Sequence, residues 1–315
     1  MRVSPVLGAI ALLGSLVGLF PNAALAQDKV IGIGFQKYGN LILLKGRGGL
    51  ESRLAPLGYK IEWKEFPSGP PLLEALNAGA IDFGHAGETP PIFAQAAGVP
   101  FVYAAYEPPA PKGEAILVPR DSPVKSLADL KGKKVALNKG SNVHFLLVRA
   151  LESAGLKYSD IETAFLAPAD ARAAFERGAV DAWVIWDPFQ AAAEAATGAR
   201  TLTDASGLAP NRQFYLASRK LADSDPKVLD AILAGIADID HWASGREKEV
   251  ADQLSAGIGI PAPILEVALK RQTYGVRPLD AGAVEDQQHI ADTFYALGLL
   301  PKQVVVSTVV WKPGS

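Results

Sequence analysis

Three polar residues follow a short apolar run near the middle of the chain and are of types that bind anions. Ser141, Asn142 and His144 stand at the end of the stretch KKVALNKGSNVH, residues 133–144. Hydroxyl and amide groups donate hydrogen bonds to an oxyanion, and a histidine in the first helical turn adds a donor or a positive charge. Helix capping explains Ser141 and Asn142 equally well, and His144 is also explained as a solvated residue. Our working hypothesis is an anion-binding site.

The pattern around these residues predicts a strand, a tight loop and a helix. Residues 134–137 form a short, mainly apolar run of strand type, residues 139–142 are turn formers, and apolar residues recur with a helical period from residue 143. The free N–H groups of the first helical turn and the positive end of the helix dipole then face the carboxyl end of the strand. Such a helix N-terminus suits an oxyanion without a full counter-charge.

A second strand-to-helix loop has the sequence HAGETPP, residues 85–91. Thr89 is a candidate N-cap, with Pro90 at the first helical position, where its missing N–H costs nothing. Glu88 is unexpected beside a proposed anion site, because like charges repel. It either orients the loop or meets a cationic group.

Trp183 and Trp186 lie three residues apart on a predicted strand and therefore face opposite sides of its sheet. Trp186 is nearer the carboxyl end and is the better candidate for the apolar wall of a ligand site, whereas Trp183 is expected in the core. Asp187 precedes Pro188 and is expected to be an N-cap. Gln36, at the end of the first predicted strand, is either a neutral donor and acceptor for a ligand or an ordinary loop residue.

Composition and motifs exclude several classes of chemistry. The chain has no cysteine, so disulfides, thiol nucleophiles and zinc–thiolate sites are absent. No dinucleotide-binding spacing, phosphate-binding loop or nucleophile elbow occurs, and the four histidines lack metal-ligand spacing. We therefore expect no catalytic residue, metal or cofactor.

The first 26 residues have the pattern of a signal peptide. Arg2 precedes an uncharged apolar stretch, residues 6–20, and Ala24-Leu-Ala26 has the form of a cleavage site. Gln27 would then be the first mature residue and, since it is not Cys, a lipid anchor is not expected. Without Arg2, 30 basic and 33 acidic residues leave a net charge of −3, which argues against nucleic acid or an anionic membrane as partner. We expect a soluble, exported protein.

Strands alternate with helices at short spacing, which indicates an α/β fold with mainly parallel sheets flanked by helices. Strands are predicted at residues 30–35, 60–66, 81–84, 101–105, 115–118, 134–137, 163–166 and 181–186. Helices are predicted at residues 41–54, 71–78, 92–97, 127–130, from 143, 169–177, from 188, and at 227–242, 247–256, 262–270 and 283–297, with little strand after residue 211.

Two punctuated segments divide this pattern into two lobes. The proline-rich residues 107–112 and the polar residues 201–211 are expected to cross between them. The sequences ALNAGAID and AFERGAVD, 99 residues apart, indicate the same βα unit on each side of the first crossing. We expect residues 28–108 and 212–315 in lobe 1, residues 109–211 in lobe 2, and a ligand cleft between them. Arg212, beside the second crossing, could contact an oxyanion with two donors, although exposed arginines are common.

Several runs resemble the substrate-binding proteins of bacterial aliphatic sulfonate ABC transporters. They are GFQK, EFPSGPPLLEALNAGAIDFG, GETPPIFAQAAG, EPPAPKGEAILVP, KKVALNKGSNVH and PADARAAFERGAVDAWVIWDPF, between residues 34 and 189. The resemblance implies a type II periplasmic-binding-protein fold whose two lobes close on a ligand. The matched positions expected in the cleft are Gln36, Gly87, Glu88, Thr89, Ser141, Asn142, His144, Trp186 and Asp187, whereas Arg212 falls outside a fixed motif.

The function implied by the resemblance is that of a periplasmic receptor that delivers alkanesulfonates to a membrane permease for sulfur acquisition. We expect it to act as a monomer. Receptors for taurine, sulfate esters, nitrate or thiamine precursors share the architecture, as do pyrimidine-precursor synthases. The predicted export signal argues against such an enzyme, and an apolar wall at Trp186 argues against a small inorganic anion.

Overall fold

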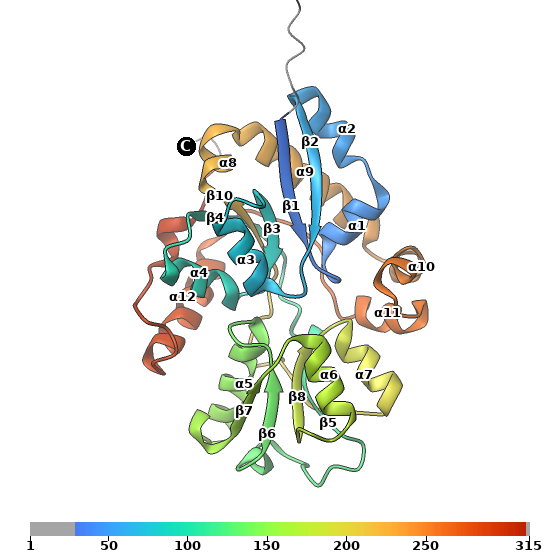
Figure 1. The fold of residues 1–315 in the computed structure, drawn as a ribbon, viewed down its shortest axis with the longest axis vertical. Coiled ribbons are helices and arrows are strands. Elements are labelled where there is room, and N and C mark those ends of the chain that lie inside the picture. The colour runs from blue at the N-terminus through green and yellow to red at the C-terminus, as the bar shows by residue number, and fades with distance from the viewer. Residues whose placement is uncertain (1–28, 313–315) are drawn as a thin grey trace, which may run out of the picture.

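The computed structural model of the protein describes residues 29–312, which form two lobes with one five-stranded sheet each (Figure 1). The predicted signal peptide, residues 1–26, lies outside the described residues. Lobe 1 is the upper half of Figure 1 and lobe 2 the lower half. Among the described helices, none is long and apolar enough to cross a membrane.

The sheet of lobe 1 has the strand order β2-β1-β3-β10-β4. Its strands are β1 (Lys29–Phe35), β2 (Tyr59–Glu65), β3 (Phe83–Ala86), β4 (Phe101–Tyr106) and β10 (Phe214–Ser218). The helices that accompany it are α1 (Asn40–Arg47), α2 (Leu50–Leu54), α3 (Gly69–Asn77), α4 (Thr89–Ala97), α8 (Arg219–Ser224), α9 (Pro226–Ala243), α10 (Glu247–Ile258), α11 (Ala262–Leu269) and α12 (Ala281–Ala296).

The sheet of lobe 2 has the order β7-β6-β8-β5-β9. Its strands are β5 (Glu114–Val118), β6 (Lys134–Leu137), β7 (Glu162–Phe165), β8 (Ala182–Trp186) and β9 (Arg200–Asp204), and its helices are α5 (Asn142–Ser153), α6 (Pro168–Glu176) and α7 (Phe189–Thr197). Short 3-10 helices are η1 (Ala55–Leu57), η2 (Pro111–Gly113), η3 (Leu127–Leu130), η4 (Tyr158–Asp160) and η5 (Val306–Val309).

One strand in each sheet runs against the other four. β10 pairs antiparallel with β3 and β4, and β5 pairs antiparallel with β8 and β9, while the β1–β2, β1–β3, β6–β7 and β6–β8 pairs are parallel. The expectation of mainly parallel sheets flanked by helices is confirmed, and the single antiparallel strand makes each sheet a mixed one. The reason lies in the crossings: β5 and β10 are the first strands after the chain changes lobe, so each enters its sheet from the cleft and runs away from it.

Two strands were not predicted. Residues 200–204, expected to be part of a crossing, form the polar edge strand β9, and β10 lies in the part of the chain expected to be helical. The predicted helix at 41–54 is also divided into α1 and α2, because Gly48 and Gly49 adopt φ values of 70° and 98°. The other predicted elements agree with the structure to within three residues at each end.

The two lobes repeat one βα unit. Asp82 accepts a hydrogen bond from the Gly32 backbone N–H at 2.9 Å, and Asp181 accepts one from the Lys134 backbone N–H at 2.8 Å. α3 and α6 are followed by Gly79 and Gly178, with φ values of 68° and 69°. The sheet orders also correspond strand by strand, so the sequence echo between residues 75–82 and 174–181 marks a structural repeat.

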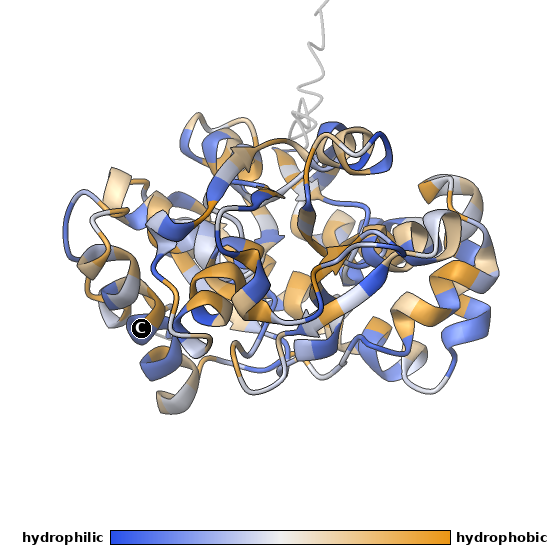
Figure 2. Cartoon of the chain, turned by 90° about the horizontal axis from the view of Figure 1, so that it is seen from below, coloured by the Kyte–Doolittle hydropathy of each residue, from blue (hydrophilic) through white to orange (hydrophobic). Residues whose placement is uncertain are grey.

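The outer helices carry polar and apolar residues along their length (Figure 2), as expected for helices that pack against a sheet on one side only. One apolar core joins the sheet of lobe 1 to α1, α9 and α10. The other continues from lobe 2 into lobe 1. Its junction includes Phe294 of α12, whose ring lies 5.2 Å from the rings of Phe93 and His144, so the lobes share apolar packing beside the crossings.

Candidate functional site

A cavity of about 90 Å³ lies between the lobes. Residues from both crossings, from both lobes and from the α10–α11 hairpin surround it. They are Lys37, Tyr38, Gly39, Gly87, Glu107, Pro108, Ala110, Gly113, Asn142, Trp186, Asp187, Pro188, Asn211, Arg212, Gln213, Leu254, Ile258, Leu265, Ala268, Leu269, Arg271, Gln272 and Thr273.

Four helices begin at this cavity. Gly39 precedes α1, Gly87 stands just before α4, Asn142 opens α5 and Pro188 precedes α7, and all four residues line the wall. The repeat explains the arrangement, since each lobe turns the carboxyl ends of its parallel strands and the starts of the following helices toward the cleft. Helix N-termini favour an anion at this place.

Asn142 connects the two lobes and the second crossing. Its side-chain amide donates to the Glu114 carboxyl group and, at 3.0 Å, to the Asn211 side-chain oxygen. Gly87 of lobe 1 lies against it: a Cβ added to Gly87 would stand 2.9 Å from the Asn142 Cβ. Glycine at position 87 therefore permits the close approach of the lobes.

Ser141 and His144 do not line the cavity. Ser141 is the N-cap of α5, but its hydroxyl donates to the Asn138 carbonyl at 2.7 Å. His144 Nδ1 accepts from the Gly140 backbone N–H at 3.3 Å, so the neutral ring carries its proton on Nε2, 2.8 Å from the Tyr158 hydroxyl. Burial lowers the pKa of His144 to about 4. The structure thus places a neutral His144 behind the loop that it was expected to assist.

Glu88 and Thr89 are buried beside the cavity rather than on its wall. The Glu88 carboxylate accepts the backbone N–H groups of Asn211 and Arg212 at 3.2 and 3.0 Å, which ties α4 to the second crossing. Burial raises the pKa of Glu88 to about 7, against the lowering effect of Arg212. Thr89 is the first residue of α4 and not its N-cap, and its hydroxyl has no hydrogen-bond partner among residues 29–312.

Gln36 is also buried, and its amide donates to the His85 carbonyl at 2.9 Å. The next three residues of the loop, not Gln36 itself, reach the cavity. Arg212 does line it. Its guanidinium lies 2.7 Å from Asp286 and 3.9 Å from Glu88, and its Nε has no hydrogen-bond partner within the described part of the chain.

Trp186 lines the cavity with its ring 6.5 Å from that of Tyr38, whereas Trp183 is fully buried against Phe175. The two tryptophans thus face opposite sides of β8. Asp187 lines the cavity too. The N-cap of α7 is Pro188, yet the Asp187 carboxylate still accepts from the Ala191 backbone N–H at 3.0 Å. Burial raises the pKa of Asp187 to about 6, against the lowering effect of Arg271.

Sequence reasoning missed an apolar wall. α10 and α11 pack against each other as a hairpin. Five of its apolar residues line the cavity; they are Leu254, Ile258, Leu265, Ala268 and Leu269. The helical period of both segments indicated that each buries one face. It carried no information on whether that face meets a core or a ligand cavity.

Sequence reasoning also missed the buried acid Glu107. Its Oε1 accepts from the Tyr215 hydroxyl at 2.7 Å and from the Asn40 amide at 3.0 Å. Burial first, and then the neighbouring Asp240, raise the pKa of Glu107 to about 8. A protonated Glu107 does not repel an anion in the cavity. No group of three or more His, Asp or Glu side chains suited to a metal occurs in residues 29–312.

Known proteins resemble this chain in sequence and in fold. The model of the NMT1-like family matches residues 32–258. A relative from Escherichia coli strain K12, described as an aliphatic sulfonates-binding protein, is 44% identical over 307 residues, which are 96% of each chain. The chain belongs to the NMT1-like family, in the group of the aliphatic sulfonate-binding proteins.

Two solved structures of this group have the same fold. The periplasmic aliphatic sulphonate binding protein of Escherichia coli is 44% identical with a TM-score of 0.83, over 91% of this chain and 93% of that one. The alkanesulfonate-binding protein of Xanthomonas axonopodis pv. citri, bound to MOPS, is 42% identical with a TM-score of 0.86, over 91% and 99%. The two-lobed fold of this NMT1-like protein is therefore that of periplasmic sulfonate-binding proteins.

Proposed function

We propose that the protein is the periplasmic receptor of an ABC importer for alkanesulfonates and supplies sulfur. One observation carries the proposal: four helix N-termini and an apolar wall meet in one cavity between two lobes. A sulfonate group needs hydrogen-bond donors and positive potential, and its alkyl chain needs apolar contact. The relatives described as aliphatic sulfonate-binding proteins support a ligand that has both an anionic head and an apolar chain.

The head and tail of the ligand have distinct places in this proposal. The sulfonate oxygens accept hydrogen bonds near Gly39, Gly87 and Asn142. Arg212 supplies a further donor, because its Nε has no hydrogen-bond partner among residues 29–312. The alkyl chain runs between Trp186 and the α10–α11 hairpin. The lobes are residues 28–108 with 212–315 and residues 109–211, and ligand contacts to both favour their closed arrangement.

The apolar wall favours alkanesulfonates over the other anions. Nitrate and sulfate offer it no apolar group, and the ammonium group of taurine would lose hydration against it. Delivery requires a permease in the inner membrane, and we propose that the receptor acts as a monomer, without nucleic acid or a cofactor. Residues 1–26 direct its export.

A ligand series tests the proposal. The mature protein from Gln27 is heated with alkanesulfonates of increasing chain length and with taurine, sulfate and nitrate. A ligand at a hundredfold excess over its dissociation constant stabilises the folded state by about 2.7 kcal/mol. We expect a rise in the melting temperature that grows with chain length and is absent for sulfate and nitrate. Shifts from inorganic anions alone, or from no member of the series, would contradict the proposal.

A further inference from the structure

We propose that Arg271 is a positioning residue that clasps the α10–α11 hairpin to lobe 2 and so holds the cavity closed over its ligand. This inference rests on the proposed function. It concerns an arginine that lines the cavity of an anion receptor and would ordinarily be assigned to the anion itself.

The contacts of Arg271 cross from one lobe to the other. Its guanidinium donates to Glu194 of α7 at 2.7 Å and lies 3.3 and 3.5 Å from the two carboxylate oxygens of Asp187. Both acids belong to lobe 2, and Asp187 lines the cavity. The three side chains are only 10 to 23% exposed, so water weakens these charged contacts less than it would at the surface.

The hairpin itself is attached to lobe 1. The Lys37 ammonium group donates to the Ile258 carbonyl at 3.5 Å, and the Gln272 amide donates to Asn40 at 2.7 Å. The Thr273 hydroxyl donates to the Pro108 carbonyl at 2.8 Å. The residues on either side of Arg271 thus move with lobe 1 and the first crossing, and its ion pairs connect them to α7.

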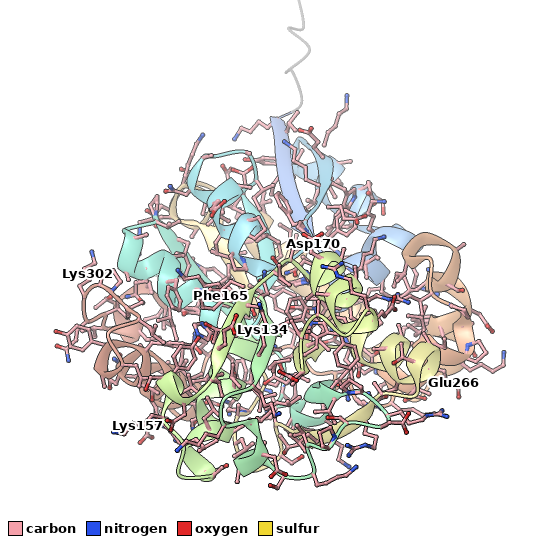
Figure 3. The ribbon with its side chains drawn as sticks, turned by 60° about the horizontal axis from the view of Figure 1, so that its bottom comes forward. Lys134, Lys157, Phe165, Asp170, Glu266 and Lys302 are labelled. Atoms are coloured by element: carbon pink, nitrogen blue, oxygen red, sulfur yellow. The ribbon has the colours of Figure 1, made fainter. Side chains whose placement is uncertain are left out.

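The outer face of the hairpin provides a contrast. Glu266, labelled at the periphery in Figure 3, pairs with Lys270 at 2.7 Å within α11 and its last turn. In this pair Lys270 is exposed and Glu266 is half-buried, and both residues belong to lobe 1. Lys270 and Arg271 are neighbours in sequence, yet only Arg271 joins the lobes.

The charges around Arg271 argue against direct ligand binding. One guanidinium faces two carboxylates, so the group as a whole is negative and offers no net attraction to a sulfonate. An anion would have to displace Asp187 or Glu194 from Arg271. When the lobes part, the clasp breaks, and the ligand can leave past the apolar wall. Arg271 should therefore act on the rate of release more than on the rate of association.

Stopped-flow binding of a sulfonate identified with the wild-type protein tests the clasp. We expect Arg271→Gln and Glu194→Gln each to raise the dissociation rate about tenfold, with association changed less than about threefold. Arg271→Lys should restore part of the slow release, because an ammonium group still pairs with Glu194. Lys270→Gln, the matched control on the same hairpin, should leave both rates unchanged.

Glu194→Gln separates the clasp from direct ligand binding. If Arg271 binds the anion itself, removing a competing carboxylate should slow release or leave it unchanged, and that result overturns the inference. The same holds if both variants keep the wild-type rates. A wild-type protein that binds no sulfonate contradicts the proposed function instead, so the two failures are distinguishable. A thermal melting curve of each variant without ligand checks that the variant is folded.

Discussion

Single residues set how closely the lobes approach. Gly87 has ordinary backbone angles, yet a Cβ there would stand 2.9 Å from the Cβ of Asn142 in the other lobe. We expect Gly87→Ala to weaken sulfonate binding by about tenfold or more, equivalent to about 1.4 kcal/mol, because the closed state must shift to admit the methyl group. Titration calorimetry measures the loss.

Gly257 offers the matched control for this substitution. It lies in α10, has ordinary backbone angles, and a Cβ there meets no atom within 4 Å. We expect Gly257→Ala to keep the wild-type affinity and to gain a few tenths to about 1 kcal/mol of stability from helix propensity. Equal affinity in both glycine variants would show that contact between Gly87 and Asn142 is not needed for binding.

Glu107 should make the stability of the protein depend on pH. Burial and Asp240 raise its pKa from 4.5 to about 8 in the folded state, so the folded protein holds a proton that the unfolded chain releases. Its favourable contribution is present below about pH 4.5 and is lost as pH rises to about 8, with a slope of up to about 1.4 kcal/mol per pH unit. Glu107→Gln mimics the protonated group and removes this slope.

Denaturant unfolding of both proteins between pH 5 and pH 9 measures the effect. The free energy of unfolding of Glu107→Gln should rise relative to that of the wild type as pH increases. A difference that stays constant with pH would mean that Glu107 is ionised throughout. Sulfonates remain anionic between pH 5 and pH 9. Any pH dependence of sulfonate binding over this range therefore comes from the protein and not from the ligand.

The α10–α11 hairpin is the element that should select the ligand tail. Each methylene that is buried against the wall contributes about 0.8 kcal/mol, or roughly a fourfold gain in affinity. We expect Leu269→Ala to reduce this gain for short chains and to move the preferred chain length upward, because the wall recedes. Calorimetry with a series of linear alkanesulfonates gives the affinity per methylene.

Leu297 serves as the control, since it follows α12 and is 39% exposed. Leu297→Ala should leave the chain-length profile unchanged. If Leu269→Ala does so as well, the alkyl chain does not run along the hairpin.

The whole molecule should close when ligand binds. The two crossings, residues 107–113 and 205–213, run together: the Glu107 backbone N–H donates to the Gln213 carbonyl at 2.8 Å and that of Ala110 to Pro210 at 3.1 Å. A paired connection of this kind permits the lobes to swing about one axis. We expect the radius of gyration from small-angle scattering to fall when a sulfonate is added, and to be unaffected by nitrate.

Arg271→Gln should weaken this change in shape at subsaturating ligand, and Lys270→Gln should not. Bound sulfonate with no change in the radius of gyration would mean that the lobes are already closed in the free protein.

Local patterns were enough for most of the elements. The strand, loop and helix at β6 and α5 followed from a short, mainly apolar run, turn formers and a helical period, all of which are properties of neighbouring residues. β9 was not predicted because a polar edge strand has no apolar run. β10 was not predicted although residues 214–217 are apolar, because the chain after residue 211 was assigned to helices. Both depend on pairing with strands far away in the sequence.

The residues expected in the candidate site fall into two groups. Gly87, Asn142, Trp186, Asp187 and Arg212 line the cavity. The other expected residues serve the structure around it: Gln36, Glu88, Thr89, Ser141 and His144 are buried beside it. Residue type and position after a strand predicted loops that line the cavity. They did not predict which side chain of each loop turns inward, because packing against the other lobe decides that direction.

The amino-acid sequence by itself determined the alternation of strands and helices, the repeat of one βα unit and the helix starts that suit an anion. These follow from hydrophobic period and turn chemistry, which act over a few residues. Only the tertiary structure decided that Gly87 meets Asn142, that the α10–α11 hairpin supplies the apolar wall, that Arg271 pairs with lobe 2, and that burial raises the pKa of Glu107. Each of these depends on contacts, burial and charge brought together from distant parts of the chain.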